Sequence, residues 1–137
     1  PGLLEKISDQ EIYYYVRSKF PWPLSDRDFV VHNKVWQDPE THTFYSRSKV
    51  LNDYLDEVDG VVRINEFEAA WEITPLSNGR YDLEYTFYTD PGGNIPNWLV
   101  NHFLDIAPFK TIKSLEAEAQ KPKYSNASFT FVNEPKF

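Results

Sequence analysis

Cysteine and methionine are both absent from this chain of 137 residues. Without cysteine there can be no disulfide, no thiolate nucleophile and no sulfur ligand for zinc. The three histidines, His32, His42 and His102, show neither the HxH nor the HExxH spacing of a histidine metal site. We therefore expect no bound metal and no cofactor.

Long apolar runs are lacking as well, and no segment approaches the length that crosses a bilayer. No signal peptide is visible at the start of the chain. These absences favour a soluble protein, and we expect it in the cytoplasm.

Basic residues are in the minority, because 14 Lys and Arg face 21 Asp and Glu and leave a net charge of −7. Non-specific binding of nucleic acid requires a positive surface that displaces counterions, so nucleic acid is not an expected partner. A polybasic membrane anchor is excluded on the same ground. Transient contact with a membrane through an apolar loop is compatible with this charge.

Aromatic residues, by contrast, make up 17% of the chain and can supply much of its apolar burial. The length suits a single domain over residues 1–137. The chain opens with Pro1 and Gly2 and not with methionine. We therefore expect a processed fragment, a truncated form or the ordered part of something longer.

Five segments have the composition of β-strands, since they are rich in β-branched and aromatic residues. They are Glu11–Ser18 and residues 28–36, 42–50, 61–75 and 80–90. In the longest of them Glu66, Glu68 and Glu72 alternate with apolar residues, which predicts an antiparallel sheet with one face in water. Residues 51–59 predict a loop, and residues 128–132 predict a short additional strand.

A long helix is predicted after the turn Pro91-Gly92-Gly93, reaching to about residue 120, with a kink at Pro108. One stripe at helical spacing holds Ile95, Trp98, Leu99, His102, Phe103, Ile106 and Phe109. A second apolar side of the same helix holds Val100, Leu104 and Ala107. A sheet followed by one segregated helix indicates the α+β class.

Polar residues interrupt the predicted inward faces of the sheet and the helix, namely Asn33, Arg63, Asn65 and His102. In a dry core each would cost roughly 1–3 kcal/mol if left unpaired. A cavity with apolar walls and a few placed polar groups removes this cost and is typical of a small-molecule site. In the alternative, Arg63 pairs with a carboxylate such as Asp28 or Asp90, His102 is a satisfied core histidine, and the asparagines bond to strand backbone.

Two short motifs carry a family resemblance. Arg27-Asp28-Phe29-Val30 opens the second predicted strand, and Asp90-Pro91-Gly92-Gly93 leads into the phrase Ile95-Pro96-Asn97-Trp98 at the start of the helix. In this order they resemble the START (StAR-related lipid-transfer) domain family. The resemblance implies a helix-grip fold, in which a curved antiparallel sheet and a C-terminal helix hold a lipid or another hydrophobic ligand between them.

The resemblance also implies a lid and a set of ligand contacts. The lid would be the loop over residues 52–59, with Tyr54, Leu55 and Val58 as its apolar contacts. Family members often place an arginine six residues after the arginine of the first motif, to meet the polar head of the lipid, and this chain has the neutral Asn33 there. The predicted ligand contacts are Tyr14, Phe29, Val31, Asn33, Arg63, Asn65, Phe67, Tyr85, Phe87, Trp98, Leu99, His102, Phe103 and Ile106.

The first part of the family pattern, a helix and the initial strands, has no counterpart in this sequence. A sheet edge left open in this way invites pairing with another chain. Together with the second apolar side of the helix, the open edge predicts either a homodimer or an N-terminal segment that completes the sheet.

The expected function is non-catalytic binding of a lipid, with or without its transfer. The alternative is an enzyme similar to the polyketide cyclases and aromatases of the same superfamily, with His102 and either Tyr85 or Arg63 as acid–base groups. A third reading is an interaction module whose aromatic residues form only a core. No close pairing of a nucleophile with a base is visible to favour the enzyme.

Overall fold

The computed structural model describes residues 2–136, which contain seven strands, one long helix and one short 3₁₀ helix. The strands are β1 (Gly2–Ser8), β2 (Glu11–Ser18), β3 (Asp26–Gln37), β4 (Phe44–Val50), β5 (Val61–Arg63), β6 (Glu66–Pro75) and β7 (Tyr81–Asp90). The helices are α1 (Asn97–Ala119) and η1 (Pro122–Tyr124). The predicted α+β class is confirmed.

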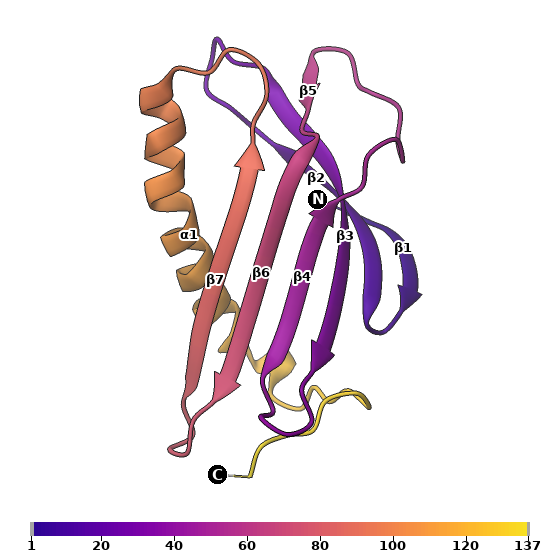
Figure 1. Ribbon diagram of the computed structural model, residues 1–137, viewed down its shortest axis with the longest axis vertical. Helices are drawn as coiled ribbons and strands as arrows, with labels where there is room; N and C mark the ends of the chain where they lie inside the picture. Colours follow the sequence, from indigo (N-terminus) through magenta and orange to yellow (C-terminus); the bar gives the residue numbers. More distant parts are fainter. Residues whose placement is uncertain (1, 137) are drawn as a thin grey trace.

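One sheet contains all these strands in the order β1-β2-β3-β4-β6-β7, with β5 paired to β3 beside this path. The pairings are antiparallel except that of β5, which runs parallel to β3. Figure 1 shows the strands as one curved layer with α1 along one side of it, closest to β7. This is the helix-grip arrangement. Within residues 2–136, no helix combines the length and the apolar character that crossing a bilayer requires.

The register of the strands decides which side chains face α1. Asn33 lies opposite Ser48, Ser48 opposite Ala69, and Ala69 opposite Phe87, so these four side chains share one face of the sheet. Phe87 lines a hollow together with residues of α1, so this is the face toward the helix.

The buried core sits on the same face. Phe29, Val31 and Ile64 form a cluster of buried side chains. Tyr14, Val16, Val50 and Phe67 pack against this cluster from neighbouring strands. The cluster lies on β2, β3, β4 and β6 and on the segment between β5 and β6, so side chains of the sheet itself fill its middle.

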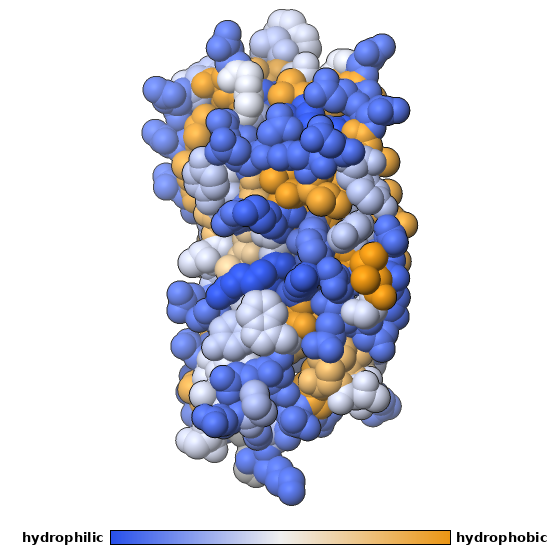
Figure 2. All heavy atoms as spheres, turned by 45° about the vertical axis from the view of Figure 1, so that its right-hand side comes forward, coloured by the Kyte–Doolittle hydropathy of each residue, from blue (hydrophilic) through white to orange (hydrophobic). Residues whose placement is uncertain are grey.

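The opposite face of the sheet carries the charged residues. Arg47 pairs with Glu72 at 2.9 Å and Lys49 with Glu68 at 3.1 Å, both across the β4–β6 pair. Figure 2, turned by 45° from the view of Figure 1, shows a surface made mostly of hydrophilic side chains with apolar groups between them. The predicted division into an apolar face and a solvated face is confirmed.

The prediction of one continuous strand over residues 61–75 is wrong, because the structure has two strands there. β5 ends at Arg63 and β6 begins at Glu66. The N–H of Ile64 donates to the carbonyl oxygen of Asp28 at 2.9 Å, so β5 leaves the line of β6 and pairs with β3. The break changes the faces: Ile64 joins the core, and Arg63 points to the side of the sheet away from α1.

Two further expectations are corrected. Gly2–Ser8 forms the edge strand β1, which the sequence pattern did not predict because all seven of its residues are exposed and show no alternation. Residues 128–132 form no strand, and the rings of Phe129 and Phe131 instead contact each other with centroids 5.6 Å apart. The predicted helix is confirmed, and it continues through Pro108 as one element.

Arg27 ties the start of β3 to the turn that precedes α1. Its guanidinium donates to the carbonyl oxygens of Pro91 at 3.2 Å and Gly92 at 3.0 Å, and to that of Ser25. It also lies 4.6 Å from the ring centroid of Phe20, a cation–π distance. The side chain is 2% exposed. Its charge is therefore satisfied by backbone oxygens, and the position of the turn depends on that of β3.

Asp28, the next residue, holds Arg63 in a bidentate ion pair. Arg63 donates from Nε at 2.8 Å and from Nη2 at 3.2 Å, and the Tyr15 hydroxyl donates at 3.0 Å. These hydrogen bonds, that from Arg63 first, lower the pKa of Asp28 against the raising effect of its burial. Arg63 also donates to the carbonyl oxygens of Leu55 and Asp56. The interpretation of Arg63 as the partner of Asp28 is thus confirmed.

We expect Gly93→Ala to destabilise the protein more than Gly79→Ala. Both glycines have a positive φ, +70° and +77°, where an added Cβ costs about 1–2 kcal/mol. A Cβ at position 93 would also lie 3.2 Å from Nη2 of Arg27, whereas a Cβ at position 79 would meet nothing within 4 Å. Urea unfolding should therefore show the larger loss for Gly93→Ala. Equal losses would mean that the Arg27 side chain can move away from the added Cβ without lowering the free energy of unfolding.

Candidate functional site

A hollow of about 260 Å³ lies between the sheet and the first half of α1. It is lined from the sheet, from the turn before the helix and from the helix itself. The lining residues are Ser18, Lys19, Phe20, Phe29, Ile64, Phe67, Phe87, Thr89, Pro91, Ile95, Val100, Phe103, Leu104 and Ala107.

The walls of this hollow are apolar on both sides. The rings of Phe29 and Phe67 meet on the sheet with centroids 4.8 Å apart, and Phe103 of α1 lies 5.3 Å from Phe20. Phe103 and Leu104 are 38% and 44% exposed although they line the hollow, so the space between helix and sheet is open to water. Covering such apolar surface is favourable, and a hydrophobic guest would do so.

A band of uncharged polar groups continues along the same face of the sheet. The side-chain amide of Asn33 donates to the hydroxyls of Ser46 at 2.8 Å and Ser48 at 2.9 Å, and to the carbonyl of Arg47 at 3.2 Å. Within residues 2–136 the carbonyl oxygen of the Asn33 side chain accepts no hydrogen bond. It is therefore available to a donor on a ligand.

Two tyrosines lie on either side of this band, Tyr14 on β2 and Tyr85 on β7. In the described part of the chain neither hydroxyl makes a hydrogen bond. The ring of Tyr85 packs on Trp71 with centroids 4.3 Å apart. Burial, and to a lesser degree Tyr14, raises the pKa of Tyr85. Tyr85 therefore remains protonated and can donate a hydrogen bond.

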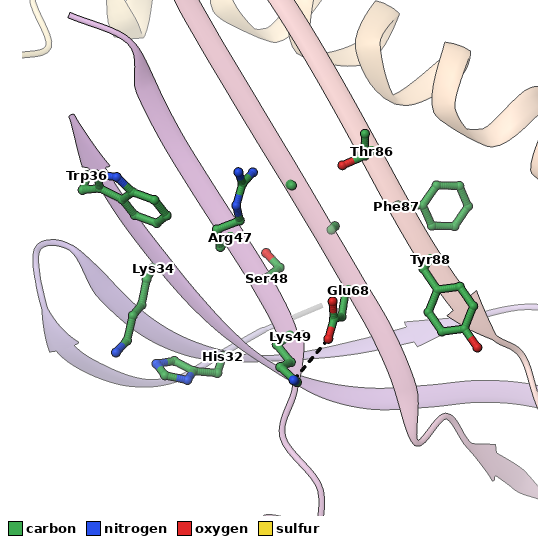
Figure 3. Close-up of a pocket in the computed structure, with 12 residues that line it drawn as sticks. His32, Lys34, Trp36, Arg47, Ser48, Lys49, Glu68, Thr86, Phe87 and Tyr88 are labelled. Carbon is green, nitrogen blue, oxygen red and sulfur yellow. Dashed lines mark ion pairs between the residues drawn. The ribbon is translucent and has the colours of Figure 1, made fainter. Parts of the chain in front are cut away.

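A larger groove, of about 700 Å³, lies on the other face of the sheet (Figure 3). Its basic residues form ion pairs: Lys49 meets Glu68, as the dashed line in Figure 3 marks, while Arg47 meets Glu72 and Lys34 meets Glu11, two carboxylates beyond the lining. Exposed ion pairs of this kind contribute little free energy. Despite its larger volume, this groove is a solvated sheet face, and the hollow under α1 is the better candidate site.

The START domain family model matches residues 2–124. The chain belongs to the START domain family. It is 31% identical over 118 residues to the uncharacterized protein PA1579 of Pseudomonas aeruginosa, covering 86% of this chain and 58% of that protein. It is 28% identical over 102 residues to the phosphatidylcholine transfer protein of Mus musculus, covering 72% and 48%.

Among solved structures, the chain is similar to a fragment of the STAR-related lipid transfer protein from Xanthomonas axonopodis. The TM-score is 0.74 with 32% identity, and the match covers 88% of this chain and 66% of that one. The START domain described here thus spans about half to two-thirds of the length of these relatives.

The helix of this START domain turns a different side to the hollow from the one the stripe predicted. Val100, Leu104 and Ala107, predicted to face elsewhere, line the hollow together with Phe103. The apolar side that suggested a homodimer is therefore part of the candidate site. The homodimer itself stays a prediction, now resting only on the open edge of β1.

The other ligand contacts that were predicted on the helix differ in their exposure. Leu99 is buried and Ile106 is half-buried, but neither of them lines the hollow. Trp98 is 70% exposed, and neither Trp98 nor His102 is among the residues that line the hollow. Helical spacing identified the apolar residues, but it could not decide which of two apolar sides meets the sheet.

Two polar residues predicted to face the hollow lie elsewhere. Arg63 pairs with Asp28 on the opposite side of the sheet. Asn65 is exposed in the break between β5 and β6. Arg63 thus lies on the other face of the sheet from Tyr85, and neither His102 nor Tyr85 is among the residues that line the hollow.

The predicted lid also lies away from the hollow. The Tyr54 hydroxyl donates to the carboxylate of Glu5 at 2.9 Å, and its ring meets that of Tyr13 with centroids 5.4 Å apart. Leu55 and Val58 lie beside β1 and the Asp28–Arg63 pair, in a separate recess. Residues 52–59 therefore pack on β1 and β2, and none of them lines the hollow.

We expect Asn33→Leu to change ligand preference more than stability. The substitution removes the only amide from the polar band but leaves a side chain that packs on an apolar face, so the cost in unfolding free energy should be about 1 kcal/mol. Urea unfolding and competition between a long-chain alcohol and the matching alkane would measure the two effects. Asn65→Leu, at an exposed position, is the matched control. Parallel losses of binding and stability in Asn33→Leu would count against a role in a pocket.

Proposed function

We propose that this START domain binds a hydrophobic small molecule, a lipid, in the hollow between the sheet and α1, and that it does so without catalysis. The observation that carries this proposal is the open apolar space lined from both elements, with Phe67 and Phe87 on one side and Phe103 and Leu104 on the other. The names of its relatives, which include lipid transfer and phosphatidylcholine transfer proteins, support the class of ligand.

The volume of the hollow bears on how such a ligand would lie. Pockets that enclose small molecules measure roughly 300–1,000 Å³, and the hollow, at about 260 Å³, is at or below this range. A lipid would therefore extend from the hollow along the face that carries Asn33 and Tyr85. The remaining wall would come from an N-terminal segment of a longer protein or from a second copy, which makes residues 1–137 an incomplete START domain.

Transient membrane contact is the second part of the proposal. Trp22, in the loop between β2 and β3, is 92% exposed, and Trp98 at the start of α1 is 70% exposed. Figure 1 places this loop and the start of α1 at the same end of the molecule. Phe20 and Ile95, close to the two tryptophans in sequence, line the hollow. Tryptophan favours the boundary between lipid and water, so this end suits ligand exchange with a bilayer.

The binding site is tested by native mass spectrometry of gently purified protein. We expect a co-purified lipid as a mass adduct, and we expect Ala107→Trp to remove most of it because the indole fills the hollow. Ala117→Trp, on an exposed part of the same helix, should keep the adduct. Thermal unfolding followed by circular dichroism would verify that both variants are folded. An adduct that survives Ala107→Trp in full would place the ligand elsewhere.

Membrane contact is tested by sedimentation with phosphatidylcholine vesicles. Replacing both Trp22 and Trp98 by alanine should weaken binding by about tenfold or more, because each exposed indole loses apolar burial worth more than 1 kcal/mol. Phe109→Ala is the matched control, since Phe109 is 63% exposed but lies farther along α1. If both variants sediment like the unchanged protein, this end of the molecule is not the contact.

A further inference from the structure

The face of the sheet toward α1 is almost free of charge. In β2, β3, β4, β6 and β7, every position that shares this face with Phe29 and Phe87 carries an apolar or a neutral polar side chain, except Arg27. Arg27 is committed to backbone carbonyls. The acidic and basic side chains of these strands, such as Lys49 and Glu68, lie on the other face.

The helix side of the hollow is also free of charged residues. Val100, Phe103, Leu104 and Ala107 are the residues by which α1 lines it. Among the residues that line the hollow, Lys19 alone is charged, and it is exposed at the rim. Apart from Lys19 at the rim, a charged group on a ligand would thus find no counter-ion among the lining residues, and burying a charge without a partner costs several kcal/mol.

Hydrogen-bonding capacity, in contrast, is left over on this face. The Asn33 side-chain oxygen and the hydroxyls of Tyr14 and Tyr85 have no partner among residues 2–136. The hydroxyls of Ser46 and Ser48 accept from Asn33 and can still donate. These groups can both donate to and accept from a hydroxyl, an ester or an amide, which matches the pairing needs of a neutral lipid head.

We propose that the ligand of this START domain has an uncharged polar end, such as a hydroxyl, an ester or an amide, which lies against Tyr14, Asn33 and Tyr85. Lipids whose head carries a phosphate or a carboxylate are discriminated against. This inference rests on the proposed function, because it specifies the ligand of the same site.

The test uses four ligands that share one oleoyl chain and differ in the charge of the head. They are 1-oleoylglycerol, oleate, oleoyl lysophosphatidic acid and oleoyl lysophosphatidylcholine, each competing at pH 8 with a fluorescent acylglycerol that carries its dye on the chain. We expect 1-oleoylglycerol to displace the probe at a concentration at least about tenfold lower than any of the three charged ligands.

Two variants connect this preference to the proposed residues. Asn33→Lys adds a cation to the neutral face and should shift the preference about tenfold toward oleate, whereas Asn65→Lys adds the same charge at an exposed position and should not. Tyr85→Phe removes one hydroxyl without a change of charge and should weaken 1-oleoylglycerol more than octadecene, a hydrocarbon without a polar end. Tyr88→Phe, whose hydroxyl bonds Glu66 on the other face, is its control.

The possible results separate the two proposals. Displacement by 1-oleoylglycerol and by the charged ligands at equal concentrations would overturn the uncharged head while leaving lipid binding intact. A tenfold preference that is unchanged in Asn33→Lys and in Tyr85→Phe would overturn the assignment to this face. Failure of all four ligands to displace the probe, or failure of the probe to bind, would overturn the proposed function as well.

Discussion

The paired residues Arg27 and Asp28 hold together three parts of the chain that are far apart in sequence. Arg27 reaches the turn at Pro91 and Gly92, and Asp28 holds Arg63 at the end of β5. Both side chains are almost fully buried, so their charges must be satisfied in place or the fold loses several kcal/mol. The start of α1 and the break between β5 and β6 are therefore set by one dipeptide at the beginning of β3.

This constraint explains why a hollow can exist at all. The core of Phe29, Val31 and Ile64 is filled from the sheet itself, and α1 is held at its start by the turn that Arg27 binds. The helix can then stand off the sheet without collapsing onto it, which leaves Phe103 and Leu104 facing space. The contacts that stabilise the fold lie in the sheet and at the start of α1, so the hollow between the sheet and the helix does not have to be filled.

The separation of charge between the two faces of the sheet gives that space its chemical character. Ion pairs such as Arg47–Glu72 occupy the solvated face, and hydroxyl and amide groups occupy the face toward α1. Because alternate residues of a strand point to opposite faces, charged and uncharged residues alternate along the strands with a period of two. A ligand between sheet and helix would accordingly meet rings, hydroxyls and one amide.

The sequence alone determined the class of fold, the strands β2, β3, β4 and β7, the helix and the division of the sheet into two faces, because each depends on local composition and on alternation. That Asn33, Tyr14 and Tyr85 share one face was decided by the register of the strands in the structure. The sequence did not determine that Arg63 leaves that face, since this follows from the bond of Ile64 to Asp28, a contact between segments distant in sequence. The side of α1 that meets the sheet was likewise decided only by the tertiary structure, because helical spacing identifies two apolar sides and does not distinguish between them.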